Sequence, residues 1–135
     1  MLMIDLCTTS GFACNEAASP VAVDGLRRTF RNLPDDYARW LRKANGGEGF
    51  VGENYLILWR AEEIEQFNRE YEAAEYAPGL LLIGSSGGGE GYAFDTRNDP
   101  WSIVSVPFIG MEVKYAVRIG DTFTDFIKHL HNVPS

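Results

Sequence analysis

Residues 80–96 read LLLIGSSGGGEGYAFDT, and this stretch predicts a β-hairpin. Residues 80–83 form a short apolar run, which is typical of a strand that is buried on both faces. The glycine-rich residues 85–91 favour a turn or loop. The chain then returns through residues 92–96, where aromatic side chains stand two residues apart, as on the buried face of a strand.

Three further segments predict strands, which gives about five in all. Residues 55–59 and 102–106 are apolar runs too short for helices, and Pro107 suggests that the second run ends or lies at a sheet edge. Residues 111–119 alternate apolar and polar side chains, which predicts a strand with one exposed face.

Helical spacing of apolar residues predicts four helices, over residues 23–31, 34–44 and 61–73 and from residue 121 or 122 onward. Asp35 and Asp36 lie in the first turn of the second helix, where the helix dipole favours anions. Its Trp40 is predicted to be buried, so Trp40→Ala should cost about 3–5 kcal/mol. The third helix should bury Ile64, Phe67 and Tyr71. The buried stripe of the last helix should be Phe123, Phe126, Ile127 and Leu130.

The composition is that of one acidic domain. The chain has 135 residues, 45% of them hydrophobic, and a formal charge of −7. We expect an extended lead-in over residues 1–18 and a single domain over residues 19–135. Two cysteines without a dense paired pattern suggest a reducing compartment. A poor signal-peptide pattern and the lack of a long apolar run favour the cytoplasm without membrane contact.

The order of these elements and several local strings resemble the SUKH superfamily, which includes fungal cell-wall-synthesis regulators of the Smi/Knr type and many bacterial immunity proteins. The strings are residues 33–37, 45–47, 83–95 and 122–127, with Glu63-Ile64 opening a helix. The resemblance covers about residues 20–130. It implies an α+β fold, a mixed or mostly antiparallel sheet backed by helices, and a role in neutralising toxins, often nucleases, by direct binding.

No segment carries a recognisable catalytic, cofactor or metal motif. The glycine-rich residues 87–91 lack the ending of a phosphate-binding P-loop. His129 and His131 point to different sides of a helix, and Cys7 and Cys14 lack zinc-ligand spacing. The acidic pairs open helices, where the dipole explains them. We therefore predict a protein that is not an enzyme and that uses no cofactor or metal.

The leading hypothesis is an immunity protein that binds and neutralises a cognate bacterial toxin, a basic nuclease or other toxin enzyme encoded nearby. Acidic side chains would speed the encounter and aromatic anchors would slow dissociation, whereas the acidic charge disfavours direct nucleic-acid binding. The alternatives are a regulatory scaffold of the cell-wall-regulator type and, less favoured, a small hydrolase. The chain should be a monomer or a weak homodimer, pairing through residues 111–119. The candidate protein-binding residues are Glu48, Glu53, Glu90, Asp95, Asp99 and Trp101.

Overall fold

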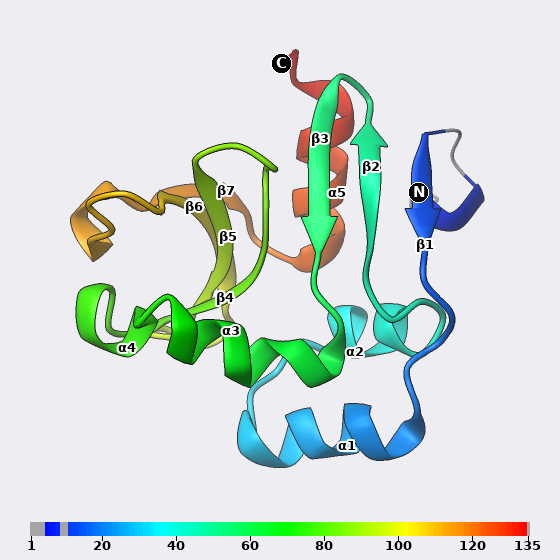
Figure 1. Cartoon of the computed structure of the whole chain (residues 1–135), viewed down its shortest axis with the longest axis horizontal. Helices are drawn as coiled ribbons and strands as arrows, with labels where there is room; N and C mark the ends of the chain where they lie inside the picture. The colour runs from blue at the N-terminus through cyan, green and yellow to red at the C-terminus, as the bar shows by residue number, and fades with distance from the viewer. Residues whose placement is uncertain (1–4, 9–10, 135) are drawn as a thin grey trace.

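The computed structural model describes residues 5–8 and 11–134, and they form an α+β fold (Figure 1), as the sequence predicts. The strands are β1 (Phe12–Cys14), β2 (Gly47–Val51), β3 (Asn54–Leu58), β4 (Leu80–Ser85), β5 (Glu90–Asp95), β6 (Ser102–Pro107) and β7 (Val117–Gly120). The helices are α1 (Pro20–Thr29), α2 (Asp35–Leu41), α3 (Ile64–Glu70), α4 (Ala73–Tyr76) and α5 (Phe123–Asn132), with short 3₁₀ turns at Leu6–Thr8, Ala61–Glu63 and Val113–Tyr115. Within the described ranges, no helix is long and apolar enough to cross a membrane.

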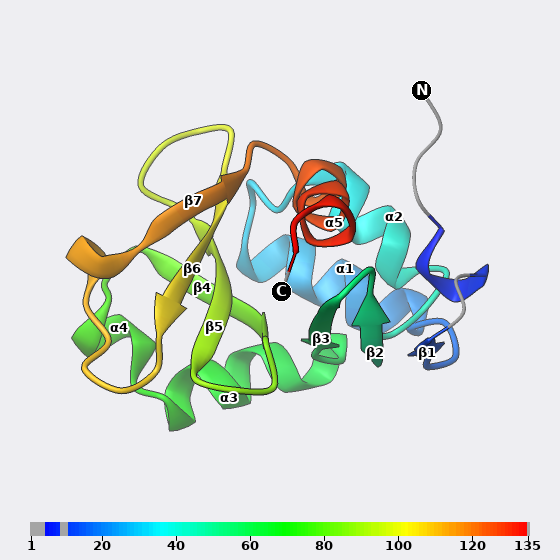
Figure 2. The same cartoon turned by 90° about the horizontal axis from the view of Figure 1, so that it is seen from above.

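The sheet runs in chain order from β1 to β7, and every neighbouring pair of strands is antiparallel. The junction between β3 and β4 has only two residue pairs, whereas β5 and β6 pair at six positions. The sheet therefore opens at this junction into a β1–β3 section and a β4–β7 section, and α5 lies between the two (Figure 2).

Seven strands replace the predicted five because β1 and β2 carry weak sequence signals. In β2, glycines occupy alternate positions where an apolar strand would carry bulky side chains. The close approach of β1 requires these glycines: a Cβ on Gly49 would lie 2.7 Å from the Cα of Phe12. The hairpin at residues 80–96 forms as predicted, with β4 and β5 paired.

The core forms where α2 and α5 meet the sheet. The predicted stripe of α5, from Phe123 to Leu130, is buried. Tyr37 packs with its ring centroid 5.1 Å from Phe94 and 5.2 Å from Phe123, and Trp40 lies 5.7 Å from Phe123. The burial predicted for Trp40 is therefore confirmed, since the residue is 6% exposed.

Asp36 joins α2 to the start of α5. Its Oδ1 accepts from the backbone N–H of Tyr37, and its Oδ2 accepts from the backbone N–H and the hydroxyl of Thr124, each at 2.9 Å. Thr122 caps the same helix by accepting from the N–H of Asp125 at 3.0 Å. Asp36 thus supplies an anion to the N-terminus of a second helix as well as to its own.

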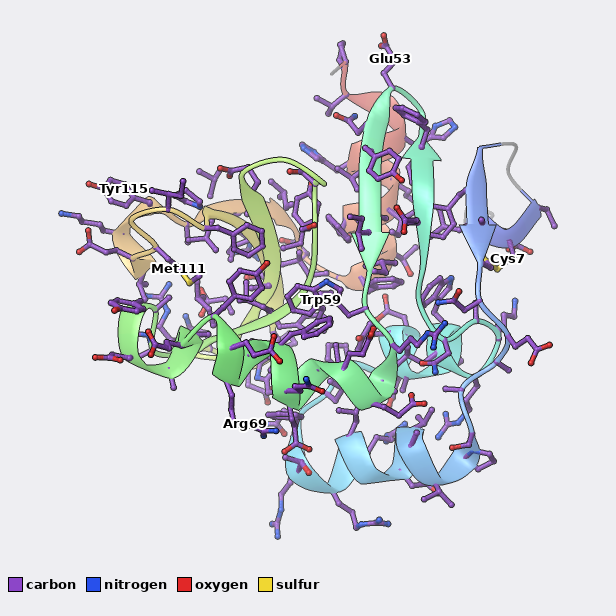
Figure 3. The ribbon with its side chains drawn as sticks, viewed as in Figure 1. Cys7, Glu53, Trp59, Arg69, Met111 and Tyr115 are labelled. Atoms are coloured by element: carbon purple, nitrogen blue, oxygen red, sulfur yellow. A yellow bond between two sulfur atoms is a disulfide. The ribbon has the colours of Figure 1, made fainter. Side chains whose placement is uncertain are left out.

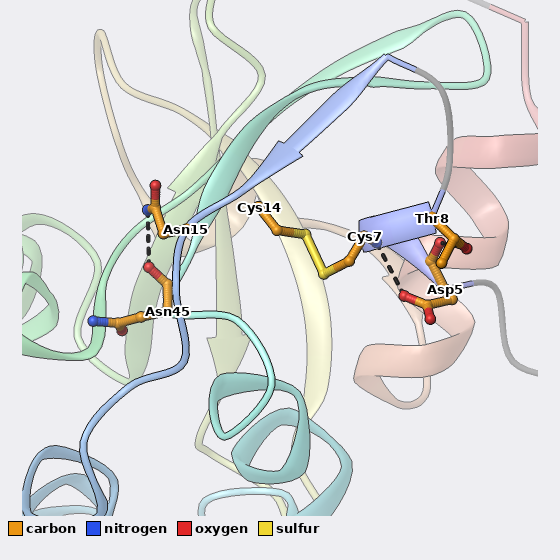
Figure 4. Close-up of a disulfide and its surroundings, with 6 residues drawn as sticks. All are labelled: Asp5, Cys7, Thr8, Cys14, Asn15 and Asn45. Atoms are coloured by element: carbon orange, nitrogen blue, oxygen red, sulfur yellow. Dashed lines mark hydrogen bonds between the residues drawn. A yellow bond between two sulfur atoms is a disulfide. The ribbon is translucent and has the colours of Figure 1, made fainter.

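The lead-in contributes more to the fold than an extended segment would. Leu6 and Phe12 are buried, and β1 pairs with β2 at one edge of the sheet. Cys7 and Cys14 form a disulfide with Cα atoms 5.4 Å apart (Figure 4), a bond that the predicted reducing compartment would disfavour. The remaining residues of the lead-in, 1–4 and 9–10, lie outside the described part.

The strand predicted over residues 111–119 is wrong over most of its length. Met111 is buried, Val113–Tyr115 forms a 3₁₀ turn, and only Val117–Gly120 forms a strand. The register pairs Val117 with Ser105. Continued pairing would set Tyr115 against Pro107, which has no N–H to donate to a sheet. Alternating apolar and polar residues therefore predict that a segment has two unlike faces, but they do not show whether a neighbouring strand can pair with it.

Candidate protein-binding surface

The net charge of the protein is concentrated in residues 47–91, which we call the acidic segment. It contains nine acidic residues and two arginines, whereas the rest of the chain contains ten acidic and ten basic residues. The acidic segment forms β2, β3, α3, α4, β4 and the β4–β5 loop, which are coloured from blue-green to yellow-green in Figure 1. The formal charge of −7 thus belongs to one continuous segment of the chain.

An aromatic row crosses the same part of the molecule, formed by Phe67, Trp59, Tyr71 and Phe108. The ring of Phe67 meets Trp59 edge-on at 4.9 Å, Tyr71 lies parallel to Trp59 at 5.9 Å, and Phe108 stacks on Tyr71 at 4.4 Å between centroids. Tyr71 is 41% exposed, which corrects the prediction that it is buried. The row therefore reaches the surface.

Local backbone structure brings these rings together. Trp59 follows β3, and its N–H donates to the carbonyl of Ile83 at 3.0 Å. Tyr71 ends α3, because Glu72 adopts a left-handed conformation with φ of 55°. Phe108 fits over the β4–β5 hairpin because Gly91 has no side chain; a Cβ there would lie 2.7 Å from the ring of Phe108.

A hollow of about 300 Å³ lies on the aromatic row, lined by Trp59, Phe67, Glu70 and Tyr71, and we call it the aromatic hollow. Three of these lining residues are aromatic and the fourth is acidic. Gln66 donates to Oε2 of Glu70 at 2.7 Å and so orients that carboxylate. In Figure 3 Trp59 lies above α3, whereas Arg69 extends below it, away from Trp59.

A second aromatic pair, one exposed ring and one half-buried ring, lies on the β2–β3 hairpin. Phe50 is 52% exposed and meets Tyr55 edge-on at 5.1 Å. The hydroxyl of Tyr55 donates to Oε2 of Glu48. This hydrogen bond, helped by partial burial and by the Glu48 charge, raises the pKa of Tyr55. Glu48 and Phe50 alternate with glycines along β2, so both side chains project from one face of the hairpin.

Three of the predicted binding residues are exposed in or beside the acidic segment. Glu48 lies in β2, and Glu53 lies in the turn between β2 and β3, which Figure 3 places at the tip of the hairpin. Glu90 opens β5 and shares a strand face with Tyr92, whose ring packs on Phe126 of α5. The structure therefore places Glu48 and Glu53 on one hairpin and directs Glu90 toward the α5 side.

The other three predicted residues lie outside the acidic segment. Asp95 is 9% exposed and is held by Arg97, whose Nε and Nη2 donate to its two carboxylate oxygens at 2.9 and 2.8 Å. These hydrogen bonds lower the pKa of Asp95. Asp99 is exposed in a loop. Trp101 is 7% exposed and its ring centroid lies 5.8 Å from that of Phe94, so this predicted binding residue is buried and is not an exposed anchor.

A larger groove of about 750 Å³ lies between the end of α1, the α3–α4 region and the start of β4. Its walls include Arg31, Arg69, Glu65 and Glu72, so its charges are mixed. The groove therefore shows no preference for the charge of a partner, in contrast to the aromatic hollow. Trp101 also lines this groove.

Sequence patterns did not indicate the aromatic row as a surface feature. Trp59, Phe67 and Tyr71 match a core pattern equally well, and Phe108 follows a strand-ending proline. The available signal was the acidic character of the helix that carries two of them. Among residues 5–8 and 11–134, no group of three His, Cys, Asp or Glu side chains is arranged to hold a metal ion.

Comparisons with known proteins identify the family. No curated protein matches the chain. The model of the SMI1 / KNR4 family (SUKH-1) matches residues 19–129, which include α1 and all the later strands and cover the acidic segment and the aromatic row. The chain therefore belongs to the SMI1 / KNR4 family (SUKH-1).

Proposed function

We propose that this protein is an immunity protein, which binds a cognate toxin protein and neutralises it without catalysing a reaction. The toxin would be basic, encoded nearby and encountered in the cytoplasm. Family membership supports this role, because the SUKH superfamily includes many bacterial immunity proteins.

The observation that carries the proposal is the coincidence of charge and exposed aromatic rings in the acidic segment. Long-range attraction between opposite charges raises the rate of encounter between proteins. Large aromatic side chains that lose water on binding supply most of the energy that holds a complex together. Tyr71, Phe50 and Tyr55 can supply such aromatic contacts, and the acidic residues near them in the chain can supply the long-range attraction.

The test is co-expression with the product of the neighbouring gene. The protein should restore growth to cells that produce the toxin, and the two proteins should elute together in size-exclusion chromatography. The association rate should fall as salt rises, because counterions screen the acidic segment. The proposal would be contradicted if the protein neither rescued cells from any neighbouring toxin nor formed a complex with one.

Sharper evidence would come from two double variants with equal net charge. Glu48→Gln with Glu70→Gln removes two charges within the acidic segment, whereas Asp24→Asn with Asp121→Asn removes two outside it. The first pair should slow association severalfold and the second should have a smaller effect. Equal effects would mean that the total charge, and no particular surface, governs the encounter.

The same family also supports a second candidate, a regulatory scaffold of the cell-wall-regulator type. Such a protein would bind an endogenous partner and would fail to rescue cells from a toxin. A hydrolase is a third candidate, tested by an activity screen of the pure protein. Any activity found should be compared with that of a variant in which His129 and His131 are both replaced, and loss of activity would favour the enzyme.

A further inference from the structure

The aromatic hollow has the chemistry of a receptor for one long cationic side chain. Trp59, Phe67 and Tyr71 offer aromatic surface, and the fourth lining residue, Glu70, carries a carboxylate. Lysine and arginine combine an apolar stem with a charged head, so the stem can lie against rings while the head meets a carboxylate. An acidic side chain would be repelled there. A purely apolar side chain would leave the carboxylate without compensation for lost water.

The surroundings strengthen this preference. The acidic segment has only two arginines, Arg60 and Arg69. Arg69 lines the mixed-charge groove on the other side of α3 and extends away from Trp59 (Figure 3). Arg60 lies at the start of the helical region, where its backbone N–H donates to Glu63 at 2.9 Å. Neither arginine is among the residues that line the aromatic hollow.

The hollow is also held in place before any partner arrives. Trp59 is 7% exposed and is stacked with Tyr71, which is itself stacked on Phe108. Asn68, one residue from Phe67, forms hydrogen bonds with both backbone groups of Leu82 in β4 at 2.9 Å. A rigid, preformed receptor loses little conformational entropy on binding, which favours an anchor site.

We infer that the aromatic hollow receives a lysine or arginine side chain of the partner protein, which anchors the complex. The inference rests on the proposed function, because it names the chemistry by which the toxin would be recognised. The partner is thus a protein that exposes a basic side chain on a convex surface, with further basic residues facing the acidic segment.

The first test uses blocked pentapeptides that alternate glycine with arginine, lysine, leucine or glutamate, added to isotopically labelled protein at low salt. The indole N–H resonance of Trp59 should shift saturably with the arginine and lysine peptides and should not shift with the other two. Trp40 and Trp101 are buried away from the hollow and serve as internal references. No shift at Trp59, or an equal shift with the leucine peptide, would overturn the inference.

The matched variants are Glu70→Gln and Glu53→Gln, which change the net charge by the same amount. Glu53 is exposed in the β2–β3 turn and lies outside the hollow. Glu70→Gln should weaken binding of the arginine peptide about three- to tenfold, and Glu53→Gln less than about twofold. Equal weakening by the two variants would show general attraction without a site, and would also overturn the inference.

The same variants applied to the toxin complex separate this inference from the proposed function. A complex that forms but is unaffected by Glu70→Gln would refute the hollow as the anchor site while leaving the immunity function intact. If no neighbouring toxin binds but the arginine peptide behaves as expected, the immunity function fails and the hollow remains a receptor for basic proteins.

Discussion

Asn68 is predicted to be the residue that fixes α3 to the sheet. The β3–β4 pairing ends at Leu58 and Gly84, so Leu82 has no strand on that side. The side-chain amide of Asn68 takes the place of a strand: Nδ2 donates to the carbonyl of Leu82 and Oδ1 accepts from its N–H, both at 2.9 Å, and Nδ2 also donates to Ile64 at 2.7 Å. Asn68→Ala would leave two backbone groups of the fully buried Leu82 without partners. At about 1–3 kcal/mol for each group, reduced by entry of water, we expect a loss of about 2–4 kcal/mol.

Urea denaturation followed by circular dichroism measures this loss as a lower midpoint with an unchanged slope. Gln66→Ala is the matched control on the same helix, because its hydrogen bond to Glu70 is exposed; it should cost less than about 0.5 kcal/mol. The Asn68 variant should also weaken the response of Trp59 to the arginine peptide, since α3 carries Phe67 and Tyr71. A cost below about 0.5 kcal/mol for Asn68→Ala would refute the idea that its amide replaces a strand.

Three further predictions concern stability. Among the described residues, none hydrogen-bonds the buried hydroxyl of Tyr37, so Tyr37→Phe should raise the free energy of unfolding by about 1 kcal/mol, and a loss in urea denaturation would show that the hydroxyl has a partner. Reduction of the Cys7–Cys14 disulfide should lower stability by about 2–3 kcal/mol and leave the protein folded, because nearly all of the core residues lie outside residues 7–14. Thermal melts with and without reductant measure this loss, and alkylation in fresh lysate reports whether the thiols are free in cells. Arg97 lowers the pKa of Asp95 below its ordinary value of 3.8, so the Asp95–Arg97 ion pair stabilises the fold above that pH and ceases to do so as the pH falls through the lowered pKa. The difference in unfolding free energy between the wild type and Arg97→Met should therefore shrink on acidification. A difference that stays constant with pH would contradict this.

Helices were the part of the fold that local sequence predicted best. The buried residues of α5 recur at helical spacing and Thr122 is a typical N-cap, and Tyr37 and Trp40 of α2 also lie at helical spacing. Hairpin β4–β5 was also predictable, because its loop is glycine-rich and its strands are apolar. These features depend on neighbours within a few residues in the chain, which is the range that periodicity reports.

Features that depend on distant partners were not predictable. The alternation at residues 111–119 did not indicate that Pro107 would end the pairing, and the glycines of β2 concealed a strand whose partner is β1. Asp36 was explained by its own helix, yet it also binds Thr124, which lies 88 residues further along the chain. In each case the interaction that decides the structure is made with a residue from a distant segment of the chain.

For the candidate site, too, some features follow from the sequence and others only from the tertiary structure. The amino-acid sequence by itself determined the α+β class, the family resemblance, the acidic charge of residues 47–91 and the aromatic side chains within reach of it. Only the tertiary structure decided that Trp101 is buried and Tyr71 exposed, and that Trp59, Phe67 and Glu70 share one hollow. The physical reason is that charge and periodicity are properties of a chain segment, whereas exposure depends on which other segments cover a side chain, and that is fixed only when the sheet and helices pack.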